Sequence, residues 1–186
     1  HDELGVVLRH RGRLTDALAA HQRALELSPE TAAFWRDLAQ TQAQARASTE
    51  ALDSYRQALA REPEAAPWHA EMGDVYAQLG QPQPALQHYR QAAALNPQEA
   101  SYLTKAGAML NDLERSEEAL ALLEQAIVLS PQGAEAHYQL ADLDGARQTF
   151  SNALRLAQRS SVDRAWSVQI LHAMGDIDVQ RLDWRQ

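Results

Sequence analysis

The 186-residue sequence contains no cysteine, few aromatic residues (6%) and no long apolar run. Without cysteine there is no disulfide framework, no thiolate zinc site and no thiol nucleophile, so a cytoplasmic and a periplasmic location both remain open. The most apolar stretch, residues 119–129, contains Glu124 and Gln125. It is also shorter than the roughly 20 apolar residues that a membrane-spanning helix needs, so no membrane span is predicted.

Positive charge is also scarce, because 17 Lys and Arg stand against 25 Asp and Glu, for a formal net charge of -8. A negative surface repels a phosphate backbone, and no basic run interrupts it, which argues against a nucleic-acid partner. A protein or peptide partner with a basic or neutral segment fits better. Arg outnumbers Lys 16 to 1 and 35 residues are Ala, a composition typical of a GC-rich bacterial source.

A repeat of 34 residues runs through most of the chain. It is most visible in four evenly spaced prolines, Pro29, Pro63, Pro97 and Pro131. The same interval aligns small residues with small ones and bulky residues with bulky ones. Examples are the small column Ala17, Ala51, Ala85 and Ala119 and the bulky column His21, Tyr55, Tyr89 and Leu123. Such recurrence predicts one structural unit repeated four times.

Each unit reads as two helices. In the third unit, apolar residues recur at helical spacing from Trp68 to Leu79, Gly80 ends this helix, and a second apolar stripe follows from Ala85. The residue before each recurring proline is pushed out of the α region, which separates one unit from the next. We therefore expect antiparallel helix pairs.

Small residues at unit positions eight, 20 and 27, a bulky residue at 24 and Pro at 32 resemble the tetratricopeptide repeat (TPR) family. The resemblance implies an all-α fold, a right-handed superhelical solenoid of antiparallel helix pairs. It divides residues 1–133 into four units, approximately 1–31, 32–65, 66–99 and 100–133. The second unit departs from the family pattern, since Gln42 and Arg46 stand where a Tyr and a Gly are usual.

The spacing changes after residue 133. Ala146, Phe150 and Ala153 arrive seven residues early, so residues 134–160 form either an irregular fifth unit with a true deletion or a unit from which residues near Leu143-Asp144 are missing. We favour missing residues, because the spacing recovers afterwards. Residues 161–186 then form a partial sixth unit or C-terminal capping helices.

Catalytic and metal-binding signatures are lacking. The sequence has no Gly-rich phosphate loop, HExxH, GxSxG or complete calcium loop. Its seven His residues include no i,i+4 pair, whereas zinc ligands on helices usually have short spacings. No enzyme activity, cofactor or metal site is predicted.

In proteins that this chain resembles, the first helix of each unit lines a concave groove. The sixth unit positions give an acidic ladder of three carboxylates, Glu3, Asp37 and Glu71. These side chains either contact a ligand or are solvated surface, and both readings stay open. The full set of candidate binding residues is Glu3, Arg36, Asp37, Gln40, Gln44, Glu71, Asp74, Gln78, Lys105, Asn111, Asp112 and Tyr138.

The groove is predicted to be acidic and polar, which suits the backbone of an extended peptide with a basic end. The carboxylates argue against a clamp for the acidic tail of heat-shock chaperones. The leading hypothesis is a protein-protein interaction scaffold, an adaptor that binds a peptide segment of a partner. Two alternatives are a regulatory or substrate-docking array of a larger enzyme, such as a glycosyltransferase, and a self-assembling scaffold or homo-oligomer.

Overall fold

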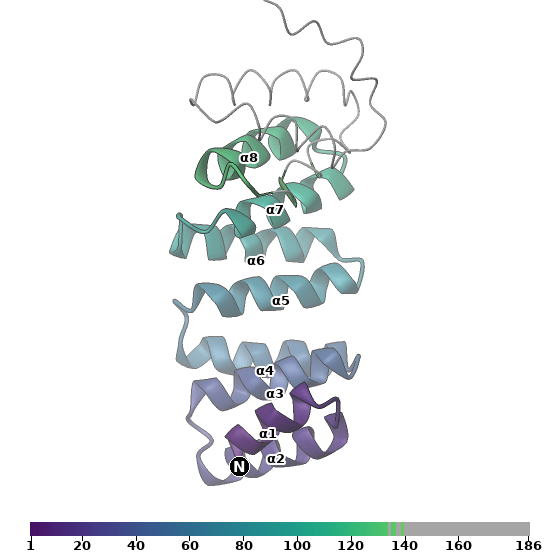
Figure 1. Ribbon diagram of the computed structural model, residues 1–186, viewed down its shortest axis with the longest axis vertical. Coiled ribbons are helices and arrows are strands. Elements are labelled where there is room, and N and C mark those ends of the chain that lie inside the picture. Colours follow the sequence, from purple (N-terminus) through teal and green to yellow (C-terminus); the bar gives the residue numbers. More distant parts are fainter. Residues whose placement is uncertain (134, 137–138, 140–186) are drawn as a thin grey trace, which may run out of the picture. The chain divides into compact units, whose positions relative to one another are not determined.

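The computed structural model is an all-α helical solenoid and describes residues 1–133, 135, 136 and 139 (Figure 1). This part of the chain forms eight helices and no strand, which confirms the predicted fold class. The helices are α1 (Asp2–His10), α2 (Leu14–Leu27), α3 (Ala32–Gln44), α4 (Ser48–Arg61), α5 (Ala66–Gln78), α6 (Pro82–Leu95), α7 (Ala100–Asp112) and α8 (Ser116–Leu129). The predictions for 134–160 and 161–186 lie outside the described residues, apart from 135, 136 and 139.

The chain divides into two compact units, His1–Pro97 and Gln98–Gln186. In the first unit α1 packs against α2, α3 against α4, and α5 against α6. Contacts of α2 with α3 and of α4 with α5 join successive pairs, while α3 also touches both α1 and α5. In the second unit α7 pairs with α8. The first helices α1, α3 and α5 are therefore neighbours, and their side chains can form one continuous surface.

The turn inside each helix pair needs one residue in the left-handed region. This residue has φ of +75° at Gly12, +62° at Arg46, +66° at Gly80 and +58° at Glu114, again 34 residues apart. Glycine adopts this conformation without steric cost, whereas for other residues the left-handed conformation costs about 1–2 kcal/mol. The second unit has Arg46 instead of glycine at this position, so its turn keeps the left-handed conformation at a steric cost.

The core repeats one packing motif, a small residue on the first helix facing a bulky one on the second. A Cβ atom on Gly5 would lie 2.6 Å from His21, one on Gly73 2.7 Å from Tyr89, and one on Gly107 2.8 Å from Leu123. In the second pair Ala39 and Tyr55 belong to one buried cluster. These close approaches explain why small and bulky columns recur together.

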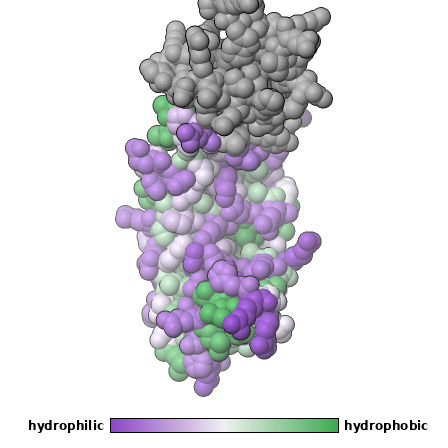
Figure 2. All heavy atoms as spheres, viewed as in Figure 1, coloured by the Kyte–Doolittle hydropathy of each residue, from purple (hydrophilic) through white to green (hydrophobic). Residues whose placement is uncertain are grey.

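Polar side chains cover most of the visible face of the first unit, with one hydrophobic patch at α1 (Figure 2). Two residues of α1, Leu4 and Val7, are 54% and 47% exposed. Leu38, which occupies the repeat position of Leu4, is 5% exposed because the preceding helix pair covers it. Among the described helices, none has the length and apolar character that a membrane crossing demands.

Candidate functional site

Eight of the twelve candidate binding residues lie on the first helices of the His1–Pro97 unit. Glu3 is on α1; Arg36, Asp37, Gln40 and Gln44 are on α3; Glu71, Asp74 and Gln78 are on α5. Lys105, Asn111 and Asp112 are on α7 in the other unit, and Tyr138 lies outside the described residues. The surface formed by α1, α3 and α5 is called the first-helix face below.

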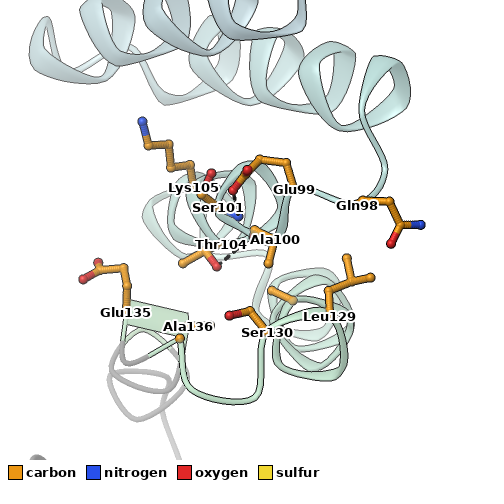
Figure 3. A pocket seen from close by; sticks show the side chains of 12 residues that line it. Gln98, Glu99, Ala100, Ser101, Thr104, Lys105, Leu129, Ser130, Glu135 and Ala136 are labelled. Atoms are coloured by element: carbon orange, nitrogen blue, oxygen red, sulfur yellow. Dashed lines mark hydrogen bonds between the residues drawn. The ribbon is translucent and has the colours of Figure 1, made fainter.

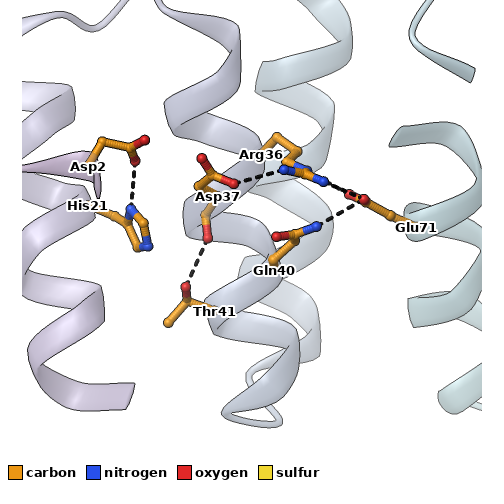
Figure 4. Close-up of polar contacts among 7 residues, drawn as sticks. All are labelled: Asp2, His21, Arg36, Asp37, Gln40, Thr41 and Glu71. Atoms are coloured by element: carbon orange, nitrogen blue, oxygen red, sulfur yellow. Dashed lines mark hydrogen bonds and ion pairs between the residues drawn. The ribbon is translucent and has the colours of Figure 1, made fainter. Parts of the chain in front are cut away.

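The centre of the first-helix face is an ion pair between neighbouring helices. Arg36 donates from Nε and Nη2 to the two carboxylate oxygens of Glu71, at 3.1 and 2.9 Å (Figure 4). Gln40 donates from Nε2 to the same carboxylate at 2.9 Å. The hydrogen bond with Glu71 raises the pKa of Arg36. A fork of this kind fixes both side chains, because the two parallel bonds restrict the geometry as well as adding energy.

Asp37 shares the same guanidinium. Arg36 Nη1 donates to Asp37 Oδ1 at 3.0 Å, and the Asp37 residue is only 8% exposed. Burial raises the pKa of Asp37, and the negative charge of Asp2 raises it further, while Arg36 opposes the shift. One cation thus contacts two carboxylates, and this three-residue cluster carries a net charge of -1 when all three groups are ionised.

Bulky residues of the second helices contact acidic residues of the first-helix face. His21 is fully buried, and its Nδ1 lies 2.8 Å from Asp2 Oδ1. Tyr89 donates its hydroxyl proton to Asp74 Oδ1 at 2.7 Å. Burial, followed by this bond, raises the pKa of Tyr89. Tyr55 holds the same position in the second pair and is buried with Ala39. Burial, then the charge of Glu71, raises the pKa of Tyr55.

Two members of the acidic ladder are therefore held by protein groups. Asp37 is buried beside Arg36, and Glu71 is bound by Arg36 and Gln40, whereas Glu3 is exposed. Sequence reasoning placed Arg36 in the candidate set but did not predict this pairing. It also left out Asp2, although the His and Tyr residues of the bulky column have polar ends that need partners near the surface.

Apart from Leu4 and Val7 of α1, the first-helix face also has exposed polar positions. Glu3, Gln44 and Gln78 are all exposed, and they come from α1, α3 and α5 respectively. Amide side chains donate and accept hydrogen bonds, so they can pair with the backbone of an extended chain. These three residues can be changed without breaking any of the contacts described above.

In the Gln98–Gln186 unit, Lys105 is half-buried and lines a pocket of about 450 Å³ (Figure 3). Ser101 and Thr104 of α7, Ser130 after α8, and Glu135 contribute to its polar lining. Thr104 donates its hydroxyl proton to Ala100 O at 3.1 Å. Asn111 and Asp112 are not among the residues that line this pocket.

Metal-binding potential is limited in the part of the chain that the structure describes. Within it, no group of three or more His, Cys, Asp and Glu side chains is arranged to hold a metal ion. The acids of the first-helix face are instead paired with Arg36, His21 and Tyr89. These acids are therefore satisfied by protein groups of the same chain.

A sequence model of the tetratricopeptide repeat family matches residues 3–67 and 70–134. No curated protein sequence matches the chain. Solved structures with a similar fold include MamA (TM-score 0.74, 19% identity, covering 87% of this chain and 98% of MamA). YrrB, described as a TPR protein with an unusual peptide-binding site, is similar with a TM-score of 0.69 and 21% identity, covering 92% of this chain and 90% of YrrB. PilF of Pseudomonas aeruginosa has a TM-score of 0.69 and 21% identity, covering 91% of this chain and 86% of PilF.

Proposed function

Because the chain belongs to the tetratricopeptide repeat family, we propose that it is a protein-interaction scaffold whose first-helix face binds an extended peptide segment with basic residues. Repeat units that stack only on their neighbours leave an extended surface that is suited to such a ligand. The contacts expected are backbone hydrogen bonds to the glutamines and ion pairs to the acids.

The main support for this proposal is the negative net charge of the first-helix face. Asp2, Glu3, Asp37, Glu71 and Asp74 supply five carboxylates, while Arg9 and Arg36 supply two guanidinium groups, which leaves a net charge of -3. Arg36 is already bound by two of the acids. A ligand with Lys or Arg residues reduces this excess charge, so electrostatic complementarity favours it over an acidic ligand and speeds its association.

Peptide selection from a random display library tests the proposal. We expect peptides selected on the wild-type protein to be enriched in Lys and Arg and to bind more weakly as the salt concentration rises. The test variant combines Gln44→Lys with Gln78→Lys, which adds two positive charges at exposed positions of the first-helix face. This variant should no longer bind the peptides selected on the wild-type protein.

The matched control combines Gln22→Lys with Gln91→Lys. It adds the same charge at exposed positions of α2 and α6, the second helices of their pairs. It should bind the selected peptides as the wild type does. Equal loss of binding in both variants, or selection of peptides rich in Asp and Glu, would contradict the proposed face and ligand.

A further inference from the structure

The pocket of the Gln98–Gln186 unit lies where the repeat pattern loses an aromatic side chain. Positions 34 residues apart hold Phe34, Trp68 and Tyr102, and the next position in this series holds Ala136. Tyr102 is 8% exposed, and Phe34 and Trp68 are half-buried, so this position places a ring against the rest of the protein. Ala136 is also buried, and it lines the pocket. A position that holds a ring in three repeats thus borders a cavity in the next.

The size and the apolar lining of the pocket suit a ring. Where a small side chain replaces a large one, a cavity remains unless the neighbouring groups move in to fill it. The volume of about 450 Å³ falls in the range of about 300–1,000 Å³ that is typical of ligand pockets. Ala100, Ala126 and Ala136 supply small apolar side chains, and Leu129 at the end of α8 supplies a larger one. An aromatic ring from another molecule therefore finds both space and apolar contacts.

The hydroxyl groups of the pocket favour a ring with a polar edge. Figure 3 shows the Ser130 hydroxyl directed toward Ala136, which is the side where the ring of the earlier repeats would stand. The Thr104 hydroxyl donates its proton to Ala100 O at 3.1 Å. A serine oxygen accepts a hydrogen bond from a phenol O–H or an indole N–H. Tyrosine and tryptophan carry such groups on their rings, and phenylalanine does not.

The charges of the pocket argue against an acidic ligand. Glu99 and Glu135 line it together with a single cation, Lys105, so these three groups carry a net charge of -1 when all are ionised. The Lys105 amino group points away from Ser130 and Ala136 (Figure 3). A carboxylate or phosphate that entered the pocket would therefore meet more negative than positive charge, whereas an uncharged ring is not repelled.

We propose that this pocket binds the side chain of a tyrosine or tryptophan in a partner protein, with the ring beside Ala136 and its polar edge bonded to Ser130. Ser101 and Leu129 are exposed, so the main chain of the partner can stay outside while the ring enters. Tyrosine and tryptophan often anchor protein interfaces, because each fills a pocket with a large and rigid ring. This site is separate from the first-helix face and does not depend on the basic peptide proposed for that face.

The experiment is an NMR titration of the whole chain with three blocked peptides, acetyl-Gly-Tyr-Gly-amide, acetyl-Gly-Trp-Gly-amide and acetyl-Gly-Leu-Gly-amide. The methyl resonances of Ala126, Leu129 and Ala136 report on the pocket. We expect the Tyr and Trp peptides to shift these resonances and to bind about fivefold more tightly than the Leu peptide, which lacks the polar edge. Because none of the peptides is charged, the result is independent of the acidic first-helix face.

Ala136→Tyr is the decisive variant, because it gives the chain the ring that the preceding repeat carries as Tyr102. It should raise the melting temperature by filling the cavity, and it should abolish binding of the peptides to the pocket. The matched control, Ala121→Tyr, adds the same ring at an exposed position of α8 that does not line the pocket, and it should bind as the wild type does. Ser130→Ala should weaken binding of the Tyr and Trp peptides by about fivefold and leave the Leu peptide unaffected.

Four results would each overturn the proposal. They are unmoved pocket resonances with the Tyr and Trp peptides, equal affinity for the Leu peptide, equal effects of Ala136→Tyr and Ala121→Tyr on binding, and a lower melting temperature of Ala136→Tyr. The last result would mean that the pocket does not accept a ring, whether the ring comes from this chain or from a partner.

Discussion

Breaking the ion pair on the first-helix face should destabilise the protein unequally, depending on which partner is changed. Arg36→Gln removes the cation from both Glu71 and Asp37, while Glu71→Gln leaves Arg36 bound to Asp37 and keeps an amide oxygen as acceptor. We therefore expect Arg36→Gln to cost more free energy of unfolding than Glu71→Gln, although both remove one charge.

The magnitudes follow from the exposure of the pair. The side chains of Arg36 and Glu71 are 31% and 22% exposed, so the pair is neither a surface contact nor a buried one. Exposed pairs contribute about 0.2–1 kcal/mol, whereas hydrogen bonds to charged groups contribute about 1.5–3 kcal/mol. We expect a coupling energy of about 1–2 kcal/mol between the two residues. The expected costs are about 2 kcal/mol for Arg36→Gln and about 1 kcal/mol for Glu71→Gln.

The assay is urea unfolding of wild type, both single variants and the double variant, followed by circular dichroism and tryptophan fluorescence. Agreement of the two probes shows that a single transition is being measured, which a repeat protein does not guarantee. Repeating Arg36→Gln in an Asp37→Asn background should reduce its cost, because the buried carboxylate is then absent. A coupling energy below about 0.3 kcal/mol, within the error of such cycles, would refute the reasoning.

Three further changes test other parts of the structure. Arg46→Gly should raise the free energy of unfolding by about 0.5–1 kcal/mol, because it removes the strain of φ +62° but loosens the unfolded chain, and urea unfolding measures it. Tyr89→Phe should lower it by about 1–2 kcal/mol through loss of the bond to Asp74, whereas a cost near zero would mean that water replaces this bond. Burial, then the charges of His69 and Arg56, lower the pKa of His88, so its contribution to stability is fully present above pH 6.5 and is lost as the pH falls from there through its folded pKa. His88→Gln should therefore flatten the decline in stability between pH 7 and pH 5, and an unchanged slope would contradict this assignment.

The helix pairs could be predicted from the sequence because a small residue packs against a bulky one in every repeat. A small residue at Gly5 or Gly73 and a bulky one at His21 or Tyr89 are both needed for two helices to approach closely, so they recur together. The left-handed turn was less visible, since Arg46 and Glu114 adopt it without being glycine. Packing with the neighbouring helices imposes the turn even where the local residue does not favour it.

The pairing of charged residues in the candidate site could not be predicted in the same way. An alignment of repeats compares residues at one position, such as Asp37 with Glu71, and suggests that like residues have like surroundings. The structure pairs different positions instead, because the fifth position of one repeat, Arg36, reaches the sixth position of the next, Glu71. Contacts of this kind depend on how the first helices lie beside one another.

The residues that break the repeat pattern are therefore the ones that give each unit its own chemistry. Gln42 replaces the expected tyrosine and accepts a hydrogen bond from Ser54 at 2.7 Å, while the same two positions of the next repeat hold Tyr76 stacked on His88. Because the helices of the two repeats have the same lengths, 13 residues in α3 and α5 and 14 in α4 and α6, we expect that a side chain can be exchanged at these positions without changing the fold. Exchanging residues between repeats at these positions therefore separates what a residue does for folding from what it does for binding.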